Sequence, residues 1–125
     1  MVPAGLFYTA THEWLKKGKD RRVTIGITDY AQNLLGDIVF IDLPAVGEKV
    51  TAKTVLSTIE SIDLTSDFLA PVTGEVLEVN DELQYSPELL NQDPFGKGLI
   101  AVLELAEDAD LANLLSAAEY ERLIK

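Results

Sequence analysis

The sequence has no cysteine and only one histidine, and these shortages exclude several kinds of chemistry. Without cysteine no disulfide can form, which fits an intracellular protein. With His12 as the only imidazole, a metal site built from several histidines is excluded, and we interpret His12 as packed or hydrogen-bonded beside Trp14. No glycine-rich phosphate loop is present, because Gly96 and Gly98 flank Lys97 without a following serine, threonine or helix. Close carboxylate pairs are expected by chance among 21 acidic residues, so the sequence indicates no enzyme and no catalytic residue.

Long apolar runs are also missing. No segment approaches the roughly 20 apolar residues that a membrane-spanning helix requires. Residues 1–15 lack the basic stretch followed by an apolar stretch that marks a signal peptide. We therefore expect a soluble, cytoplasmic protein.

Basic residues are scarce, since 10 lysines and arginines stand against 21 acids and give a net charge of −11. A chain with this charge repels phosphate backbones and anionic lipid surfaces, so we expect neither nucleic acid nor a membrane as a partner. The whole protein should prefer electropositive partner surfaces. Half of the basic residues form one cluster, which we interpret as a solvated turn between two strands. The cluster comprises Lys16, Lys17, Lys19, Arg21 and Arg22.

The rest of the composition, 47% hydrophobic and 25% charged, is typical of a globular protein. A chain of 125 residues has room for one domain with one core, which we place at residues 1–125. Short alternating or apolar segments separated by turns predict a β-sandwich or barrel. The predicted strands cover residues 23–28, 38–43, 55–62, 75–80 and 99–105, with a polar tip at residues 63–67.

One short internal helix is predicted between the first two of these strands. Thr28 and Asp29 can cap it, and it runs through Leu35. Gly36 is suited to end it in a left-handed conformation.

Further helix is predicted near the C-terminus. Leucines and alanine recur at helical spacing within residues 111–118, behind acids in residues 107–110 that suit the start of a helix. Ser116 and Glu119 could form a capping box for a final turn or two that ends near Ile124.

Several local strings then occur in a fixed order along the chain. They are Thr11-His12-Glu13-Trp14, residues 25–32, residues 35–39, Glu60-Ser61, Ser66-Asp67, Ala70-Pro71-Val72, Gly74-Glu75-Val76 and residues 91–95. Together they resemble the H-protein family of the glycine cleavage system over roughly residues 7 to 123. As a set the matches are highly specific, although no single one is.

The resemblance implies a mainly β fold, the barrel-sandwich hybrid of lipoyl/biotinyl carriers, here with a short internal helix and C-terminal helices. In that fold two similar antiparallel half-sheets pack together, and a hairpin tip presents a lysine. The lysine amine is acylated by lipoate, and the tethered arm meets partner enzymes at high effective concentration. The implied partners are glycine decarboxylase (P protein), aminomethyltransferase (T protein), dihydrolipoyl dehydrogenase (L protein) and the lipoylation enzymes.

The carrier hairpin departs from the family at its tip. The family reads Glu-Ser-Val-Lys, whereas this chain reads Glu60, Ser61, Ile62 and Asp63. Leu64 follows where the family usually has a small residue. A carboxylate cannot form the amide that joins lipoate to lysine, so Asp63 is not competent as the attachment residue.

No other lysine is expected to replace it. Lys53 lies ten residues upstream, and Lys97 lies in a loop that we do not expect at the same tip. We therefore expect no cofactor on this chain, although lipoate is the family cofactor.

By resemblance, Thr11, Glu13 and Asp67 occupy positions that line the cleft receiving the loaded arm. Their presence is as compatible with structural inheritance as with a working cleft. Leu99 follows Gly98 where the family usually has tryptophan, which is a further divergence.

These features favour an H-protein-like chain that is not lipoylated and that binds the system's enzymes or the lipoylation machinery as a scaffold, competitor or regulator. One alternative is a functional carrier whose lysine was altered. Another is a domain repurposed to bind or hydrolyse a small molecule in the former arm cleft, using Glu13, Asp67 and Asp63.

Overall fold

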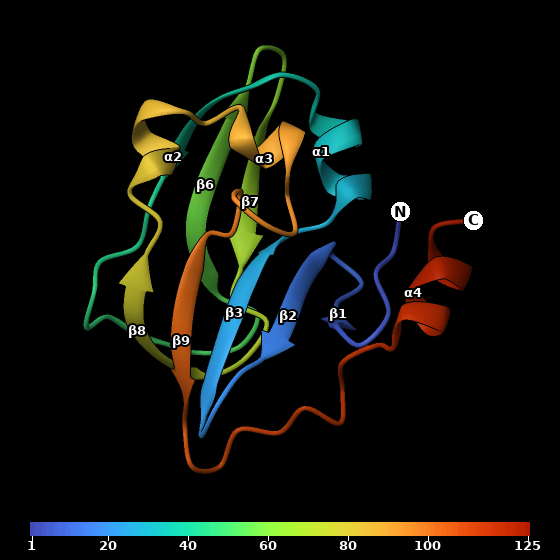
Figure 1. Cartoon of the computed structure of the whole chain (residues 1–125). Helices are drawn as coiled ribbons and strands as arrows, with labels where there is room; N and C mark the ends of the chain where they lie inside the picture. Colours follow the sequence, from blue (N-terminus) through green and yellow to red (C-terminus); the bar gives the residue numbers. More distant parts are fainter.

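The computed structural model describes residues 1–125 and consists of two antiparallel sheets with a few short helices (Figure 1). The six-stranded sheet has the order β1 (Phe7–Tyr8), β2 (Glu13–Lys17), β3 (Arg22–Ile27), β9 (Ala101–Leu105), β8 (Gly74–Val79) and β5 (Lys49–Val50). The three-stranded sheet has the order β4 (Ile38–Asp42), β6 (Val55–Ser61) and β7 (Thr65–Leu69). Buried aliphatic side chains from both sheets form the main core. The mainly β prediction is confirmed, with two sheets of unequal size.

The predicted basic turn lies between β2 and β3. Lys16 and Lys17 end β2, Arg22 begins β3, and the amide of Gly18 donates to the carbonyl of Arg22 at 2.8 Å. All five basic side chains of the cluster are exposed, so it is a solvated turn as predicted.

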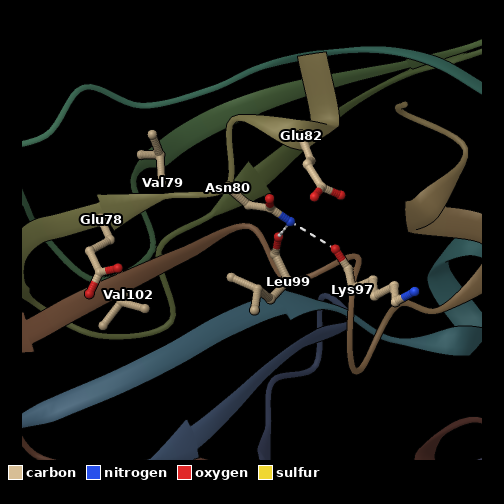
Figure 2. A pocket seen from close by; sticks show the side chains of 7 residues that line it. All are labelled: Glu78, Val79, Asn80, Glu82, Lys97, Leu99 and Val102. Carbon is tan, nitrogen blue, oxygen red and sulfur yellow. Dashed lines mark hydrogen bonds between the residues drawn. The ribbon is translucent and has the colours of Figure 1, made fainter. Parts of the chain in front are cut away.

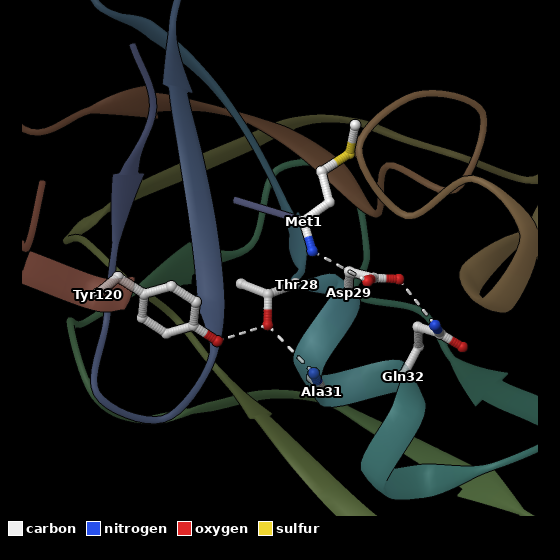
Figure 3. Close-up of polar contacts among 6 residues, drawn as sticks. All are labelled: Met1, Thr28, Asp29, Ala31, Gln32 and Tyr120. Atoms are coloured by element: carbon white, nitrogen blue, oxygen red, sulfur yellow. Dashed lines mark hydrogen bonds and ion pairs between the residues drawn. The ribbon is translucent and has the colours of Figure 1, made fainter. Parts of the chain in front are cut away.

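The internal helix α1 (Asp29–Leu35) has both of its predicted caps. The hydroxyl of Thr28 accepts from the amide of Ala31 at 3.2 Å (Figure 3). Gly36 takes the left-handed value φ 78°, and its amide donates to the carbonyl of Gln32 at 3.0 Å. These caps fix the point at which the chain leaves α1 and enters β4.

The β6–β7 hairpin is tighter than the sequence predicts. Only residues 62–64 form the turn, whereas we predicted a polar tip over residues 63–67. Thr65, Ser66 and Asp67 are already paired with β6, because the burial of Phe68 requires β7 to begin before it.

The C-terminal region contains fewer helices than the sequence predicts. Only α4 (Ala117–Leu123) forms there, and its capping box between Ser116 and Glu119 is confirmed. Residues 107–115 contain no helix, because the backbone of Leu115 makes two hydrogen bonds with Tyr8 at the edge of β1. The leucines at helical spacing instead pack as single side chains against the two apolar clusters.

Two single-turn helices fall where no helix was predicted. They are α2 (Glu82–Tyr85) and α3 (Leu89–Gln92), each of which buries one leucine, Leu83 and Leu90 respectively. One turn is too short to show a helical period in the sequence. None of the helices has the length and apolar character needed to cross a bilayer.

Candidate functional site

The hairpin tip has a backbone that is held by four hydrogen bonds around Ser61. The amide of Ser61 donates to the carbonyl of Leu64 at 2.8 Å, and the hydroxyl of Ser61 also donates to this carbonyl at 3.2 Å. The same hydroxyl accepts from the amide of Leu64 at 3.0 Å. The amide of Ile62 donates to the carbonyl of Asp37 at 3.0 Å, which ties the tip to the start of β4. The turn is therefore fixed from both sides.

The side chains of the tip point into solvent. Ile62 is 68% exposed, Leu64 is 51% exposed, and Asp63 between them is exposed as well. No hydrogen bond or ion pair involves the Asp63 carboxylate. The only ion pair in the structure joins the Met1 amine to Asp29 at 3.4 Å (Figure 3). Asp63 is thus a free negative charge at the most prominent turn of the smaller sheet.

This tip does not fit the attachment of lipoate. Position 63, which the resemblance predicts as the acceptor, carries a carboxylate, and residues 60–67 include no lysine. Lys53 lies at the open end of the hairpin, where its amide donates to the carbonyl of Ala70 at 2.8 Å. The seven residues of β6 separate Lys53 from the turn, which corresponds to roughly 20 Å of extended strand.

Lys97 lies in another part of the fold, between α3 and β9. Its carbonyl and that of Leu99 each accept from the side-chain amide of Asn80 at 2.8 Å. Figure 2 shows Lys97 and Glu82 beside an open cavity of about 410 Å³ that Leu99 also lines. No residue of the carrier hairpin lines this cavity, so Lys97 is not a neighbour of the tip there.

The three residues assigned to the arm cleft come together at a second place. Thr11 precedes β2, Glu13 begins β2, and Asp67 lies in β7, yet all three line one cavity of about 100 Å³. Side chains of α1, which the sequence did not assign to this cavity, complete its wall together with His12. The role of this cavity as an arm cleft stays a prediction.

Glu13 is the most unusual of these residues, because its carboxylate is buried without a cation. The side chain is 3% exposed and accepts hydrogen bonds from the hydroxyls of Thr9 and Thr11, the latter at 2.6 Å. Burial raises the pKa of Glu13 above its ordinary value of 4.5, and hydrogen bonds from Thr11, Thr9 and the Leu69 amide oppose part of this rise. Glu13 is therefore a solvent-shielded acceptor at the cavity wall.

A hydrogen-bonded cluster behind this cavity involves a residue that the sequence did not single out. Figure 3 shows the Tyr120 hydroxyl at Thr28 Oγ1, the cap of α1, where the distance is 2.7 Å. The same hydroxyl lies 2.8 Å from His12 Nδ1. His12 is hydrogen-bonded as predicted, but to Tyr120, while the Trp14 indole donates to the Pro94 carbonyl at 3.0 Å. Nothing in the local sequence distinguishes Tyr120 from the other tyrosines.

These groups provide no catalytic arrangement. Burial lowers the pKa of His12 below 6.5, which keeps the imidazole neutral at pH 7, and its Nδ1 is already engaged by Tyr120. No three histidine, aspartate or glutamate side chains are placed to hold a metal ion. The site consists of a fixed, exposed hairpin tip and a small cavity with a buried carboxylate.

Comparison with known proteins gives a consistent result. A family model described as glycine cleavage H-protein matches residues 6–125. The glycine cleavage system H protein of Coprothermobacter proteolyticus is 49% identical over 123 residues, which cover 98% of this chain and 97% of the relative. The H protein of Escherichia coli is 48% identical over 124 residues, covering 99% and 96%. A crystal structure of a glycine cleavage system H protein from Mycobacterium marinum superposes with a TM-score of 0.88 at 36% identity and covers 97% of both chains. With a matching fold, a match from residue 6 to the last residue and nearly half of its residues identical to these relatives, the chain belongs to the glycine cleavage H-protein family.

Proposed function

We propose that this chain is an H-family protein that is not lipoylated and acts through binding, as a scaffold, competitor or regulator within the glycine cleavage system. The observation that carries the proposal is the free Asp63 carboxylate at the tip, with no lysine in the turn. The chain has no catalytic activity of its own. We expect it to act in the cytoplasm. We treat residues 1–125 as a single carrier-type domain.

The partners follow from membership of the family. A chain this similar to H proteins over its full length has the overall shape that glycine decarboxylase (P protein), aminomethyltransferase (T protein), dihydrolipoyl dehydrogenase (L protein) and lipoylation enzymes would meet. Without an arm it can occupy their docking surfaces but cannot deliver a group. Binding without transfer would reduce the flux through the lipoylated carrier by competition.

The cavity lined by Thr11, Glu13 and Asp67 is assigned as the inherited arm cleft. Its volume of about 100 Å³ is well below the roughly 300–1,000 Å³ of ordinary small-molecule sites. Thr11 and Glu13, but not Asp67, also line a second cavity of about 400 Å³. Because the cavity that contains all three residues is too small for an ordinary ligand, we favour inheritance over a repurposed ligand-binding or hydrolytic domain. Leu64 does not line the cavity, so the tip does not close it.

Mass spectrometry of the intact protein tests the absence of lipoylation. The chain is co-expressed with a lipoyl ligase and lipoate, next to the E. coli H protein as the control for ligase activity. We expect the mass of the unmodified chain while the control gains a lipoyl adduct. An adduct on the parent chain would contradict the proposal.

The Asp63→Lys variant separates the proposal from a carrier that lost only its lysine. Because Ile62 and Leu64 add apolar bulk beside the new amine, we expect incomplete acylation and poor turnover with the decarboxylase. Complete acylation with the turnover of the E. coli relative would instead favour a functional carrier surface, and the proposal would be abandoned.

A further inference from the structure

We propose that the hairpin tip is itself a docking element, which inserts into an apolar pocket framed by lysine and arginine on a partner protein. This inference rests on the proposed binding function and names the surface and the chemistry of the partner. The surface, called the tip patch below, comprises Val39, Phe40, Ile62 and Leu64, together with the acids Asp37, Glu60 and Asp63.

The first argument is the exposure of large apolar side chains at one end of the three-stranded sheet. Val39 is 53% exposed and Phe40 is 49% exposed, next to the similarly exposed Ile62 and Leu64. Phe40 pairs with Glu60 and Ile38 pairs with Ser61, so the start of β4 lies across the sheet from the residues that lead into the tip. Contiguous exposed apolar groups mark interaction sites more often than scattered ones do.

The second argument is charge. Residues 23–48 and 54–96 contain no lysine, arginine or histidine, so every formal charge on these segments is negative. Asp37, Glu60 and Asp63 therefore lie beside the apolar residues without any basic residue from the same segments. The complementary surface is apolar in the centre and basic at its rim, which is the arrangement that speeds association and fixes orientation.

The third argument is rigidity. The Ser61 hydrogen bonds and the bond from the Ile62 amide to Asp37 hold the turn before any partner arrives. Little backbone entropy is then lost on binding, so two small anchors can contribute most of the affinity. Figure 1 shows the turn between β6 and β7 projecting beyond the rest of the molecule, where a concave pocket could receive it.

The same charges disfavour a second copy of this chain as the occupant. Two tip patches meeting each other would bring carboxylates together within an assembly of chains that each carry −11. A nucleic acid or an anionic membrane is disfavoured for the same reason.

Isothermal titration calorimetry with purified decarboxylase, aminomethyltransferase and dihydrolipoyl dehydrogenase tests the inference. We expect the parent chain to bind at least one of them, and Ile62→Ser and Leu64→Ser each to weaken binding about tenfold, which corresponds to about 1.4 kcal/mol. Asp63→Asn should weaken binding less than either serine variant does, and it should make the affinity depend less on salt concentration. Val46→Ser and Val55→Ser are the matched controls, because these side chains are 64% and 54% exposed but lie outside the tip patch.

Each outcome separates the two proposals. If the parent chain binds none of the three enzymes, the proposed function fails and the docking inference fails with it. If the parent chain binds but the tip variants bind as well as the valine controls, only the docking inference is overturned. Analytical ultracentrifugation that shows dimers of the parent chain, lost in Ile62→Ser, would identify a second copy as the occupant and overturn the inferred partner.

Discussion

The hairpin tip and the cluster around Tyr120 are built in opposite ways. At the tip, the side chains of Ile62 and Leu64 are exposed, and only the buried Ser61 and backbone groups fix the shape. Around Tyr120 the side chain is fully buried, stacks on Tyr8 with ring centroids 4.8 Å apart, and bonds to residues 92 and 108 positions away. We therefore expect the region around Tyr120 to stabilise the fold, and the tip to tolerate substitution with little loss of stability.

The largest expected effect comes from removing the buried ring. Tyr120→Ala leaves a cavity beside Tyr8 and removes both hydroxyl contacts of Tyr120, so we expect the free energy of unfolding to fall by about 3–5 kcal/mol. Urea unfolding followed by circular dichroism measures it.

Tyr120→Phe is the matched control, because it keeps the stacked ring and removes only the hydroxyl. Its expected loss is about 1 kcal/mol, since Thr28 and His12 lose a partner each. Equal losses in the two variants would show that the hydroxyl network, and not the ring, stabilises this region.

A smaller effect is expected from Glu13, and it depends on pH. Burial raises the pKa of Glu13 in the folded state, so the folded protein binds this proton more tightly than the unfolded chain does. The contribution of Glu13 to stability is then fully present below its ordinary pKa of 4.5 and is lost as pH rises through the raised folded value.

The Glu13→Gln variant separates the pH-dependent contribution of Glu13 to stability from the contributions of the other acids. Its free energy of unfolding should increase relative to that of the parent chain as pH rises from 4 toward 7. Measuring both proteins by urea unfolding across this range checks the direction. A difference that stays constant or changes in the opposite direction would refute the role of burial at Glu13.

The smallest effect on stability should come from the tip. Ile62→Ser and Leu64→Ser remove exposed side chains, so we expect the free energy of unfolding to change by no more than about 0.5 kcal/mol. Thermal unfolding next to Tyr120→Ala gives the comparison directly. A loss above 1 kcal/mol in either variant would mean that the tip also supports the fold, and the contrast between the two regions would disappear.

The sequence predicted those parts of the fold that depend on neighbouring residues. Thr28 and Gly36 cap α1 through groups three or four residues away, and Ser116 and Glu119 form their capping box in the same way. The helical spacing of residues 111–118 was misleading, because a distant partner, Tyr8, holds Leu115 in extended backbone. The backbone pairing of Leu115 with Tyr8 therefore determined the structure there, and the helical spacing of the leucines did not.

The candidate site shows the same limit. Thr11, Glu13 and Asp67 were identified only through resemblance to the family, and the cavity where they meet is lined by strands β2 and β7 of two different sheets. Tyr120 was missed because its partners, His12 and Thr28, lie about a hundred residues earlier in the chain. In contrast, the prediction that Asp63 stands in place of the attachment lysine needs only the order of residues at the tip, so it could be made from the sequence without the fold.

Residues 54–96, which contain no basic residue, also determine how the tip can be studied by proteolysis. Trypsin cuts after lysine and arginine, so it leaves residues 54–97 as one large fragment with Asp63 as its tenth residue. Protection of the tip by a partner is therefore invisible to tryptic footprinting. A protease that cuts at acidic residues has Glu60, Asp63 and Asp67 as cleavage points across the turn, and its cutting rates would report directly on whether the hairpin is covered.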